Sequence, residues 1–296
     1  MTALRQRMLE DLQIRHYSKT TIRLYLHAVT VFSQHFGKPP DQLGPEAIRS
    51  YQVYLTNEKK LAPAPILIAV SALRFLYNVT LHKGWNLEDI IPAPKKPQRL
   101  PIVLSPEEVR HFLSCVASPK YRTILTTCYA AGLRISEALH LLVSDITADG
   151  LLIRRTKFQK TRLVPLHETA VAGLGSYLMC RQEMRRGGDH VFVSNEGQPL
   201  VYWKVHSVFR TLLKSAGLKP SGGRWPRIHE LRHTFAVRAL ESSPTGRQRV
   251  GRHMLALATY LGHVNIDATY WYLETTPELL RDIADVAENF VQRRQP

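Results

Sequence analysis

The sequence predicts a mainly α-helical protein with a small β-sheet, divided into two domains. Three observations support this: a length of 296 residues, apolar positions at helical spacing along most of the chain, and one interruption by short β-type runs. Four prolines and three basic residues lie between positions 92 and 101. We therefore expect a helical bundle over residues 1–92, a basic Pro-rich linker over 93–101 and a mixed domain over 102–296.

The first domain is expected to contain about four helices, as in a small helical bundle. Ser18 can cap a helix with apolar residues every three or four positions, namely Ile22, Tyr25, Leu26, Val29, Phe32 and Phe36. Pro45 stands at a first-turn position before a second apolar run. Residues 64–85 are apolar almost throughout, which predicts a largely buried helix.

The second domain should be helical with one β interruption. Residues 105–108 (SPEE) form a capping-box pattern with proline at the first helical position. Residues 151–155 and 162–166 favour two strands around a basic turn, and residues 190–194 (HVFVS) favour a short third strand. A last amphipathic helix is expected over residues 277–292.

Charge is the strongest compositional signal. The formal net charge is +16, which favours a polyanionic partner, and nucleic acid is the leading candidate. Residues 151–262 hold 19 Lys/Arg against 6 Asp/Glu, whereas residues 263–296 hold 3 against 6. A basic middle with an acidic tail suggests a nucleic-acid surface plus a docking helix, or a tail folded onto its own domain.

The remaining composition favours a cytoplasmic protein without a membrane segment. Three cysteines lie far apart with no C-x-x-C, which fits free thiols in a reducing compartment. The N-terminus is charged throughout and lacks the apolar core of a signal peptide. No run of 18 or more apolar residues occurs.

The segment 229–233 (HELRH) has two interpretations. As H-E-x-x-H it could hold zinc between two histidines, but no H-x-x-G-x-x-H extension follows. Glu241 is a formal candidate for the third zinc ligand, but Arg232 would place a cation beside the metal. Alternatively, His229 and Arg232 lie one helical turn apart and could grip a phosphate. We favour the phosphate interpretation and expect no metal.

Four segments of the second domain carry further candidate residues: AGLRISEAL, TKFQKTRLVPL, HELRH and LGHVNIDATYWY. Together they resemble the tyrosine recombinase (phage integrase) family, whose order is Arg, a hairpin Lys, H-x-x-R, L-G-H and a Tyr nine residues later. The matching residues are Arg134, Lys157, His229, Arg232, His263 and Tyr272. The resemblance covers nearly the whole chain, and integron integrases and transposon-borne recombinases look closer than topoisomerases.

The resemblance implies a site-specific DNA recombinase with a core-binding bundle and a catalytic domain that close as a C-shaped clamp around double-stranded DNA. It implies a tetramer on paired sites, in which helix 277–292 docks on a neighbouring catalytic domain, and it suggests related recombinases as further partners. DNA integration, transposition and mobile elements are typical roles of the family. The expected location is the bacterial cytoplasm, at the nucleoid.

The chemistry of these residue types fits phosphodiester transfer. Arg134 and Arg232 supply planar forks for phosphate oxygens, and Tyr272 is the nucleophile. His229 is the natural proton acceptor or orienter, and Lys157 could protonate the leaving 5′-oxygen. His263 would hydrogen-bond the phosphate. By resemblance the product is a 3′-phosphotyrosyl link with a free 5′-hydroxyl, made without metal, nucleotide or other cofactor.

Further residues are expected to support the site or contact DNA. Glu137 and His233 are expected to support the catalytic residues. The candidate DNA contacts are Lys95, Lys96, Arg99, Lys160 and Arg162. The run between Arg232 and His263 is longer than usual in the family and suggests an inserted basic loop over 242–258, with His253 as a rival phosphate contact.

Two alternatives remain open at this point. A type IB topoisomerase would share the chemistry but relax DNA without exchanging partners. A catalytically inactive DNA-binding accessory protein would keep the basic surface and lose the chemistry. Each candidate residue could also have a purely structural role, such as a surface ion pair between Arg134 and Glu137.

Overall fold

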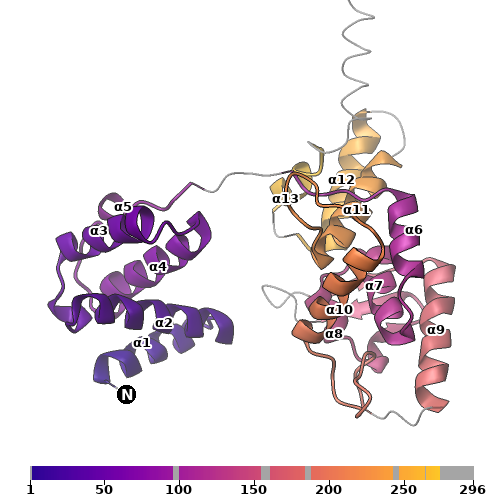
Figure 1. Cartoon of the computed structure of the whole chain (residues 1–296), viewed down its shortest axis with the longest axis horizontal. Coiled ribbons are helices and arrows are strands. Elements are labelled where there is room, and N and C mark those ends of the chain that lie inside the picture. The colour runs from indigo at the N-terminus through magenta and orange to yellow at the C-terminus, as the bar shows by residue number, and fades with distance from the viewer. Residues whose placement is uncertain are drawn as a thin grey trace, which may run out of the picture. The chain divides into compact units, whose positions relative to one another are not determined.

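The computed structural model describes residues 2–95, 100–154, 161–183, 188–242, 247–263 and 265–273. The chain separates into two compact units, Met1–Arg99 and Leu100–Pro296, which are coloured indigo to purple and magenta to yellow in Figure 1. The division falls within the predicted linker 93–101. Each unit has its own hydrophobic core, so each can be described by itself.

Helices are the only regular secondary structure among the described residues of the first unit. Its helices are α1 (Ala3–Ile14), α2 (Lys19–Phe36), η1 (Pro40–Gln42), α3 (Pro45–Val53), α4 (Pro63–Phe75) and α5 (Leu87–Ile90). Two π-helical segments, η2 (Tyr54–Glu58) and η3 (Leu76–Thr80), continue α3 and α4. The predicted helical bundle is confirmed, with α2 packed along α4 at its centre.

Local signals in the sequence set the bounds of these helices. Ser18 caps α2 as predicted, because its Oγ accepts a hydrogen bond of 3.1 Å from the backbone N–H of Thr21. Gly37 ends the helix in the left-handed conformation, with φ of 62°. In the core, the Tyr77 hydroxyl donates to the Pro40 carbonyl oxygen at 2.7 Å, which ties the segment Leu76–Thr80 after α4 to η1.

The segment Pro63–Thr80 is, among the described helices, the one long and apolar enough to cross a membrane by length and composition alone. Half of it is buried inside the first unit, where Ala72, Leu73 and Leu76 are almost fully enclosed. Its apolar character is therefore that of a core helix, as the sequence predicted.

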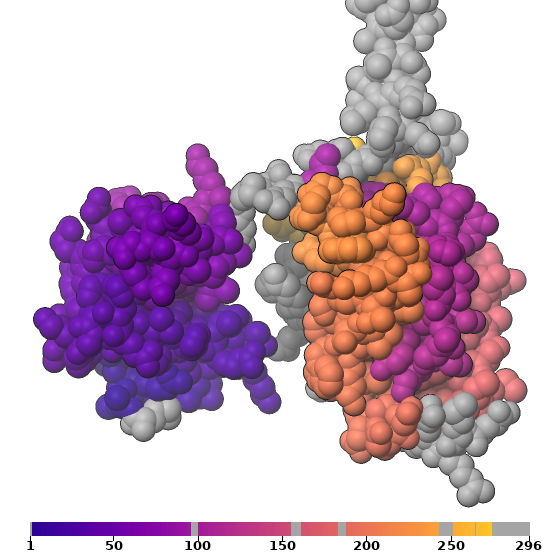
Figure 2. All heavy atoms as spheres, in the orientation of Figure 1, coloured from indigo at the N-terminus to yellow at the C-terminus, as the bar shows by residue number. Residues whose placement is uncertain are grey.

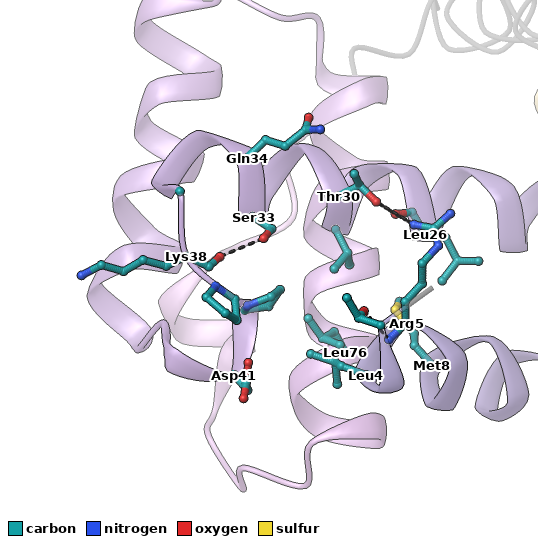
Figure 3. A pocket seen from close by; sticks show the side chains of 15 residues that line it. Leu4, Arg5, Met8, Leu26, Thr30, Ser33, Gln34, Lys38, Asp41 and Leu76 are labelled. Carbon is teal, nitrogen blue, oxygen red and sulfur yellow. Dashed lines mark hydrogen bonds between the residues drawn. The ribbon is translucent and has the colours of Figure 1, made fainter.

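A groove of about 820 Å³ opens on the first unit between α1, α2 and η1 (Figure 3). Leu4, Met8, Leu26 and Leu76 give it an apolar lining. Arg5 lies at this groove and donates to the Thr30 hydroxyl at 2.7 Å. The lining offers packing surface rather than a set of reactive groups.

The second unit is also mainly helical. Its helices are α6 (Pro106–Ser114), α7 (Pro119–Ala130), α8 (Ile135–Leu139), η4 (Val143–Asp145), α9 (Glu168–Glu183), α10 (Tyr202–Ser215), α11 (Ile228–Glu241), α12 (Arg247–Leu261) and α13 (Asp267–Tyr270). Helix α7 packs between α9 and α11. On another face, α6 and α10 adjoin (Figure 2), where the rings of Phe112 and Phe209 meet at 5.2 Å.

The β interruption is a three-stranded antiparallel sheet in the order β1-β2-β3. The strands are β1 (Ile146–Thr147), β2 (Gly150–Ile153) and β3 (Arg162–Val164), with Leu151 opposite Val164. The two predicted strands are confirmed in shorter form, and β1 was not predicted. The predicted third strand at 190–194 makes only isolated bridges, Leu142 to His190 and Val193 to Pro199, among the described residues.

The start of α6 confirms the predicted capping box. Ser105 accepts a hydrogen bond from the Glu108 backbone N–H, and the Glu108 carboxylate accepts one from the Ser105 N–H. The expected final helix over 277–292 lies outside the described residues.

The prediction of an inserted basic loop over 242–258 is wrong for residues 247–258. Residues from Arg247 onward form α12, while 243–246 lie outside the described residues. Met254, Leu257 and Leu261 recur at helical spacing and are buried against Val237 and Leu240 of α11. This apolar stripe is strong enough to hold the basic segment as a helix.

Candidate active site

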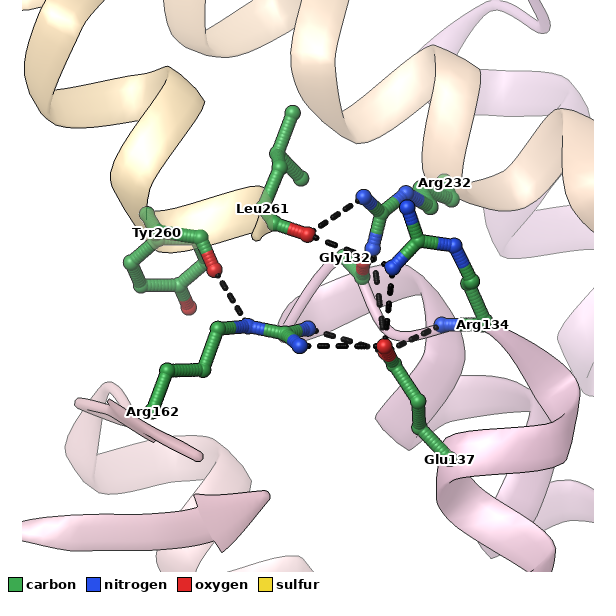
Figure 4. Close-up of polar contacts among 7 residues, drawn as sticks. All are labelled: Gly132, Arg134, Glu137, Arg162, Arg232, Tyr260 and Leu261. Atoms are coloured by element: carbon green, nitrogen blue, oxygen red, sulfur yellow. Dashed lines mark hydrogen bonds and ion pairs between the residues drawn. The ribbon is translucent and has the colours of Figure 1, made fainter. Parts of the chain in front are cut away.

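Three arginine side chains surround one buried carboxylate in the second unit (Figure 4). Arg134 Nη1 lies 2.9 Å from Glu137 Oε1, and Arg162 Nη2 lies 2.8 Å from Glu137 Oε2. Arg232 Nη1 lies 3.7 Å from Glu137 Oε2. The Glu137 side chain is only 5% exposed, so these are buried charges that depend on one another.

The ends of two helices fix Arg232 from opposite sides. Its Nη1 donates to the Gly132 carbonyl just after α7, at 2.8 Å, and its Nη2 donates to the Leu261 carbonyl at the end of α12, at 2.6 Å. Gly132 has a φ of 57°, and a Cβ there would lie 2.5 Å from the ring of Phe235. The close approach of α7 to α11 therefore requires glycine at this position.

The cluster carries more positive than negative charge. Burial raises the pKa of Glu137, but hydrogen bonding and charge from Arg162, together with Arg134 and Arg232, bring it down to about 2. Burial and the charge of Arg134 lower the pKa of Arg232 to about 10, so it remains protonated at neutral pH. Three guanidiniums thus face one carboxylate, and this excess of positive charge favours the binding of an anion such as phosphate.

Three histidines border the arginines. Burial, followed by neighbouring positive charge, lowers the pKa of His229 to about 4, and burial with the charge of Arg232 does the same for His263. Burial and the neighbouring His229 lower that of His233 to about 3. All three rings are therefore neutral at neutral pH, and each has one nitrogen that accepts and one that donates.

The contacts of these histidines differ. His263 Nδ1 lies 2.7 Å from the hydroxyl of Thr269. The rings of His229 and His233 meet edge to face at 4.4 Å. Within the described part of the chain, the His229 side chain has no hydrogen-bond partner, so both its nitrogens are available to a ligand.

Tyr272 places its hydroxyl at the centre of this group. The hydroxyl lies 2.9 Å from His233 Nδ1, and its ring stacks on His263 with centroids 6.0 Å apart. The side chain is 2% exposed, whereas Tyr270 is 49% exposed. Burial raises the pKa of Tyr272, and the charge and hydrogen bond of Arg232 partly oppose this. The phenol is protonated at rest and needs a proton acceptor before it can attack.

Only some of the site residues predicted from the sequence lie together in the structure. The structure brings together Arg134, His229, Arg232, His263 and Tyr272, with Glu137 and His233 among them. Lys96, Arg99, Lys157 and Lys160 lie outside the described residues, and Lys95 is exposed in the first unit. His253 Nε2 is instead 2.7 Å from the Ala239 carbonyl oxygen.

Arg162 was predicted as a DNA contact, but the structure places it beneath the site. Its side chain is 9% exposed, both terminal nitrogens contact Glu137, and its Nε donates to the Tyr260 carbonyl at 2.8 Å. Gly262 packs against it, since a Cβ there would lie 2.9 Å from Arg162 Nη1. The sequence analysis missed this structural role.

The zinc interpretation of HELRH finds no support in these contacts. Across the described ranges, no group of three or more His, Cys, Asp or Glu side chains is placed to hold a metal ion. His233 directs its Nδ1 to the Tyr272 hydroxyl, and Glu230 pairs with Arg227 at 2.9 Å.

Replacing Glu137 with glutamine is expected to destabilise the second unit. The change leaves buried guanidiniums without a counter-charge, which should cost about 3–5 kcal/mol of unfolding free energy. Urea denaturation measures it. The control is Glu107→Gln, because Glu107 pairs with Arg110 on the exposed surface of α6. Equal stabilities of the two variants would contradict the central role of Glu137.

Stability should fall as the pH drops below about 6.5, the ordinary histidine pKa. The folded-state pKa values of His229, His233 and His263 are lowered to about 4, 3 and 4, so the unfolded chain binds more protons in this window. Their contribution is complete above pH 6.5 and is lost as the pH falls towards 4. Between pH 7 and 5, the free energy of unfolding measured with urea should fall less steeply with decreasing pH in His233→Gln than in the wild type. An unchanged slope would refute the burial of a neutral His233.

The site therefore combines a tyrosine hydroxyl, a cationic anion pocket and neutral histidines, the groups needed by an enzyme that transfers phosphodiesters through tyrosine. The "Phage integrase family" model matches residues 103–278, and the "Phage integrase, N-terminal SAM-like domain" model matches residues 4–87. The chain belongs to the phage integrase family of tyrosine recombinases.

Individual relatives agree with this assignment. The putative integrase/recombinase y4qK of Sinorhizobium fredii is 44% identical over 281 residues, covering 92% of this chain and 84% of the relative. Tyrosine recombinase XerD of Listeria innocua is 30% identical, covering 82% of each chain. The predicted class of enzyme, a site-specific DNA recombinase, is confirmed, and these relatives give no support to the topoisomerase or accessory-protein alternatives.

Solved structures share the fold. A lambda integrase dimer bound to a COC' core site matches with a TM-score of 0.71 at 19% identity, covering 92% of this chain and 94% of that one. The XerH site-specific recombinase bound to a palindromic difH substrate matches with a TM-score of 0.73 at 20% identity, covering 93% and 82%. The expected helical bundle plus mixed domain is confirmed.

Proposed function

We propose that this protein cuts and rejoins DNA at specific sites by forming a covalent bond between Tyr272 and a DNA 3′-phosphate. The observation that carries the proposal is the position of Tyr272, whose buried hydroxyl contacts His233 and Arg232 and whose ring stacks on His263. A surface or packing tyrosine would not need a neutral histidine and a guanidinium at its oxygen.

The arginines bind and polarise the scissile phosphate. Arg134 and Arg232 neutralise its non-bridging oxygens, and Glu137 and Arg162 hold these guanidiniums in place. His229 and His263 donate hydrogen bonds to the same oxygens. Lys157, which lies outside the described residues, protonates the leaving 5′-oxygen.

The bond energy of the phosphodiester is kept in the phosphotyrosyl link. A 5′-hydroxyl from another strand can therefore attack it and release the tyrosine without ATP. The residues at this site supply nucleophile, charge and proton transfer themselves, so we propose a reaction that needs no metal.

The partner is double-stranded DNA, and the working assembly is a tetramer on paired sites. A lambda integrase structure with the same fold is a tetramer bound to a Holliday junction. Contacts to DNA involve Lys95, Lys96, Arg99 and Lys160, with Arg162 acting through Glu137. Segment 277–292 docks on a neighbouring subunit. Related recombinases are further partners, and the setting is the bacterial cytoplasm at the nucleoid.

We propose a role in integration or transposition of mobile DNA. A transposon integrase, that of Tn1549, was solved in complex with circular intermediate DNA and shares the fold. Salt-dependent binding through phosphate contacts is expected for a chain with a net charge of +16.

Trapping on nicked suicide substrates tests the function. A library of random-sequence duplexes carrying a nick is incubated with the protein, and covalent complexes are recovered under denaturing conditions. Sequencing the attached strand gives the target site, and a two-site assay beside a supercoil-relaxation assay separates recombination from relaxation. A wild-type protein that forms no covalent complex with any duplex would refute the proposal.

A further inference from the structure

Tyr272, His233 and Glu230 form a buried line of three polar side chains. The Tyr272 hydroxyl lies 2.9 Å from His233 Nδ1, and the opposite ring nitrogen, Nε2, lies 3.7 Å from Glu230 Oε2. The histidine side chain is 8% exposed and the glutamate side chain 2%. The line runs from the nucleophile into α11, and its carboxylate is Glu230 rather than Glu137.

The two oxygens of Glu230 have different surroundings. Oε1 accepts a hydrogen bond from Arg227 Nε at 3.0 Å. Oε2 is buried, has no hydrogen-bond partner among the described residues and faces His233 Nε2. A carboxylate oxygen on that side stabilises the tautomer that carries its proton on Nε2. The lone pair then lies on Nδ1, where it accepts the hydrogen bond of the Tyr272 hydroxyl.

The same contacts separate His233 from His229, to which the sequence assigned proton transfer. Within the described ranges His229 makes no hydrogen bond to Tyr272, and its ring meets only the edge of His233, at 4.4 Å. His229 is thus placed to act on the phosphate, whereas His233 is the histidine in contact with the attacking oxygen.

We propose that His233 is the proton acceptor for Tyr272, and that Glu230 positions it by holding the tautomer with an unprotonated Nδ1. The inference rests on the proposed function. As the Tyr272 oxygen forms its bond to phosphorus, the phenolic proton moves to His233 Nδ1. The bond from phosphorus to the 5′-oxygen breaks, and that oxygen takes a proton from the acid. In rejoining, the incoming 5′-hydroxyl gives its proton to Lys157 as it attacks phosphorus, the bond from phosphorus to the Tyr272 oxygen breaks, and Nδ1 returns its proton to that oxygen.

Charged and titratable groups reach His233 from every side. Arg227 at the N-cap of α11 and His229, Glu230 and Arg232 within it lie on one side, and His263 and Tyr272 lie beyond α12. Burial, with the positive charge of Arg227 and Arg232, keeps the ring neutral at rest, so that one ring nitrogen carries a lone pair. When the proton arrives, Glu230 faces the imidazolium and offsets its charge, as the buried aspartate does in Ser-His-Asp enzymes.

Single-turnover cleavage of the trapped site tests the proton transfer. Two substrates are compared, one with the normal 5′-oxygen and one with a 5′-bridging sulfur, which leaves without an acid. His233→Gln should slow cleavage of both by about 10²–10⁴-fold. Lys157→Ala should slow only the oxygen substrate. Imidazole added to His233→Gly should restore part of the rate.

Glu230→Gln tests the positioning role, and Glu241→Gln is the matched control on the same helix, where Glu241 pairs with Arg238. The first should slow cleavage about tenfold to 100-fold, whereas the second should not. ¹⁵N spectra of histidine give a readout that needs no active enzyme. The ring whose Nδ1 signal moves most in Tyr272→Phe is that of His233, because His263 Nδ1 contacts Thr269 instead. This ring should carry its proton on Nε2 in the wild type, and in Glu230→Gln it should shift towards the Nδ1–H form.

The outcomes distinguish this inference from the proposed function. Wild-type protein that forms no covalent complex overturns the function itself. Covalent complexes that form at the wild-type rate in His233→Gln but are lost in His229→Gln overturn only the assignment of the proton acceptor. A proton found on Nδ1 of this histidine in the wild-type spectrum overturns it as well, even if the His233 variants fail to fold.

Discussion

Replacing Tyr272 with phenylalanine is expected to abolish the covalent protein–DNA complex while leaving DNA binding intact. The variant removes a single oxygen, the one that lies 2.9 Å from His233 Nδ1. Without it there is no nucleophile at the phosphate, and cleavage should fall by at least about 10⁴-fold. Denaturing gels after incubation with a nicked suicide substrate measure the complex, and gel-shift titration measures binding.

The matched control is Tyr270→Phe, two residues away. Tyr270 is half exposed and has no hydrogen bond from its hydroxyl among the described residues, so its loss should leave cleavage within about threefold of the wild type. A covalent complex that disappears in Tyr270→Phe and persists in Tyr272→Phe would reverse the assignment of the nucleophile.

Replacing Arg232 with lysine should also inactivate the protein, even though the charge is kept. The guanidinium donates simultaneously to the carbonyls of Gly132 and Leu261, and an ammonium on a flexible stem cannot reproduce this fork. The phosphate then loses an oriented donor, which should reduce the cleavage rate by about 10²–10³-fold.

The control for this variant is Arg238→Lys, on the same helix, because Arg238 pairs with Glu241 at 2.6 Å. Thermal unfolding of both variants is recorded beside the cleavage rate, since Arg232 is 1% exposed and also holds α7 and α12 together. A folded Arg232→Lys protein that cleaves at the rate of Arg238→Lys would show that the fork does not act on the phosphate.

Much of the fold could be predicted because its signals are local. The cap at Ser18 and the capping box at Ser105 depend on residues within three positions, and both appear as expected. The sheet was harder. β1 has only two residues, too few for an alternating pattern, and it exists because Ile146 pairs with Leu151 across a tight turn.

Segment 242–258 shows how charge can obscure a helix. Its unusual length for the family and its basic residues suggested an inserted loop, but Met254, Leu257 and Leu261 form a stripe that α11 buries. The stripe was visible in the sequence, whereas its partner surface on α11 was not. Tertiary packing decided the structure, as it commonly does for helices of mixed composition.

The candidate site was predictable in its members and less so in its contacts. The order of motifs indicated Arg134, Arg232 and Tyr272, and the structure brings all three together. Spacing along the chain could not show that Arg162 reaches Glu137 from 25 positions away. Nor could it show that His233, rather than His229, contacts the tyrosine hydroxyl, because the two residues are four positions apart and lie on the same face of α11.

Mass spectrometry of the trapped complex tests the central claim most directly. The complex is digested with protease and nuclease, and the peptide that carries a nucleotide is sequenced. We expect a nucleotide 3′-phosphate esterified to Tyr272, with a free 5′-hydroxyl on the released strand. A nucleotide attached to Tyr270 or to any other residue, or joined through its 5′-phosphate, would contradict the assignment of Tyr272 as the nucleophile that cuts DNA.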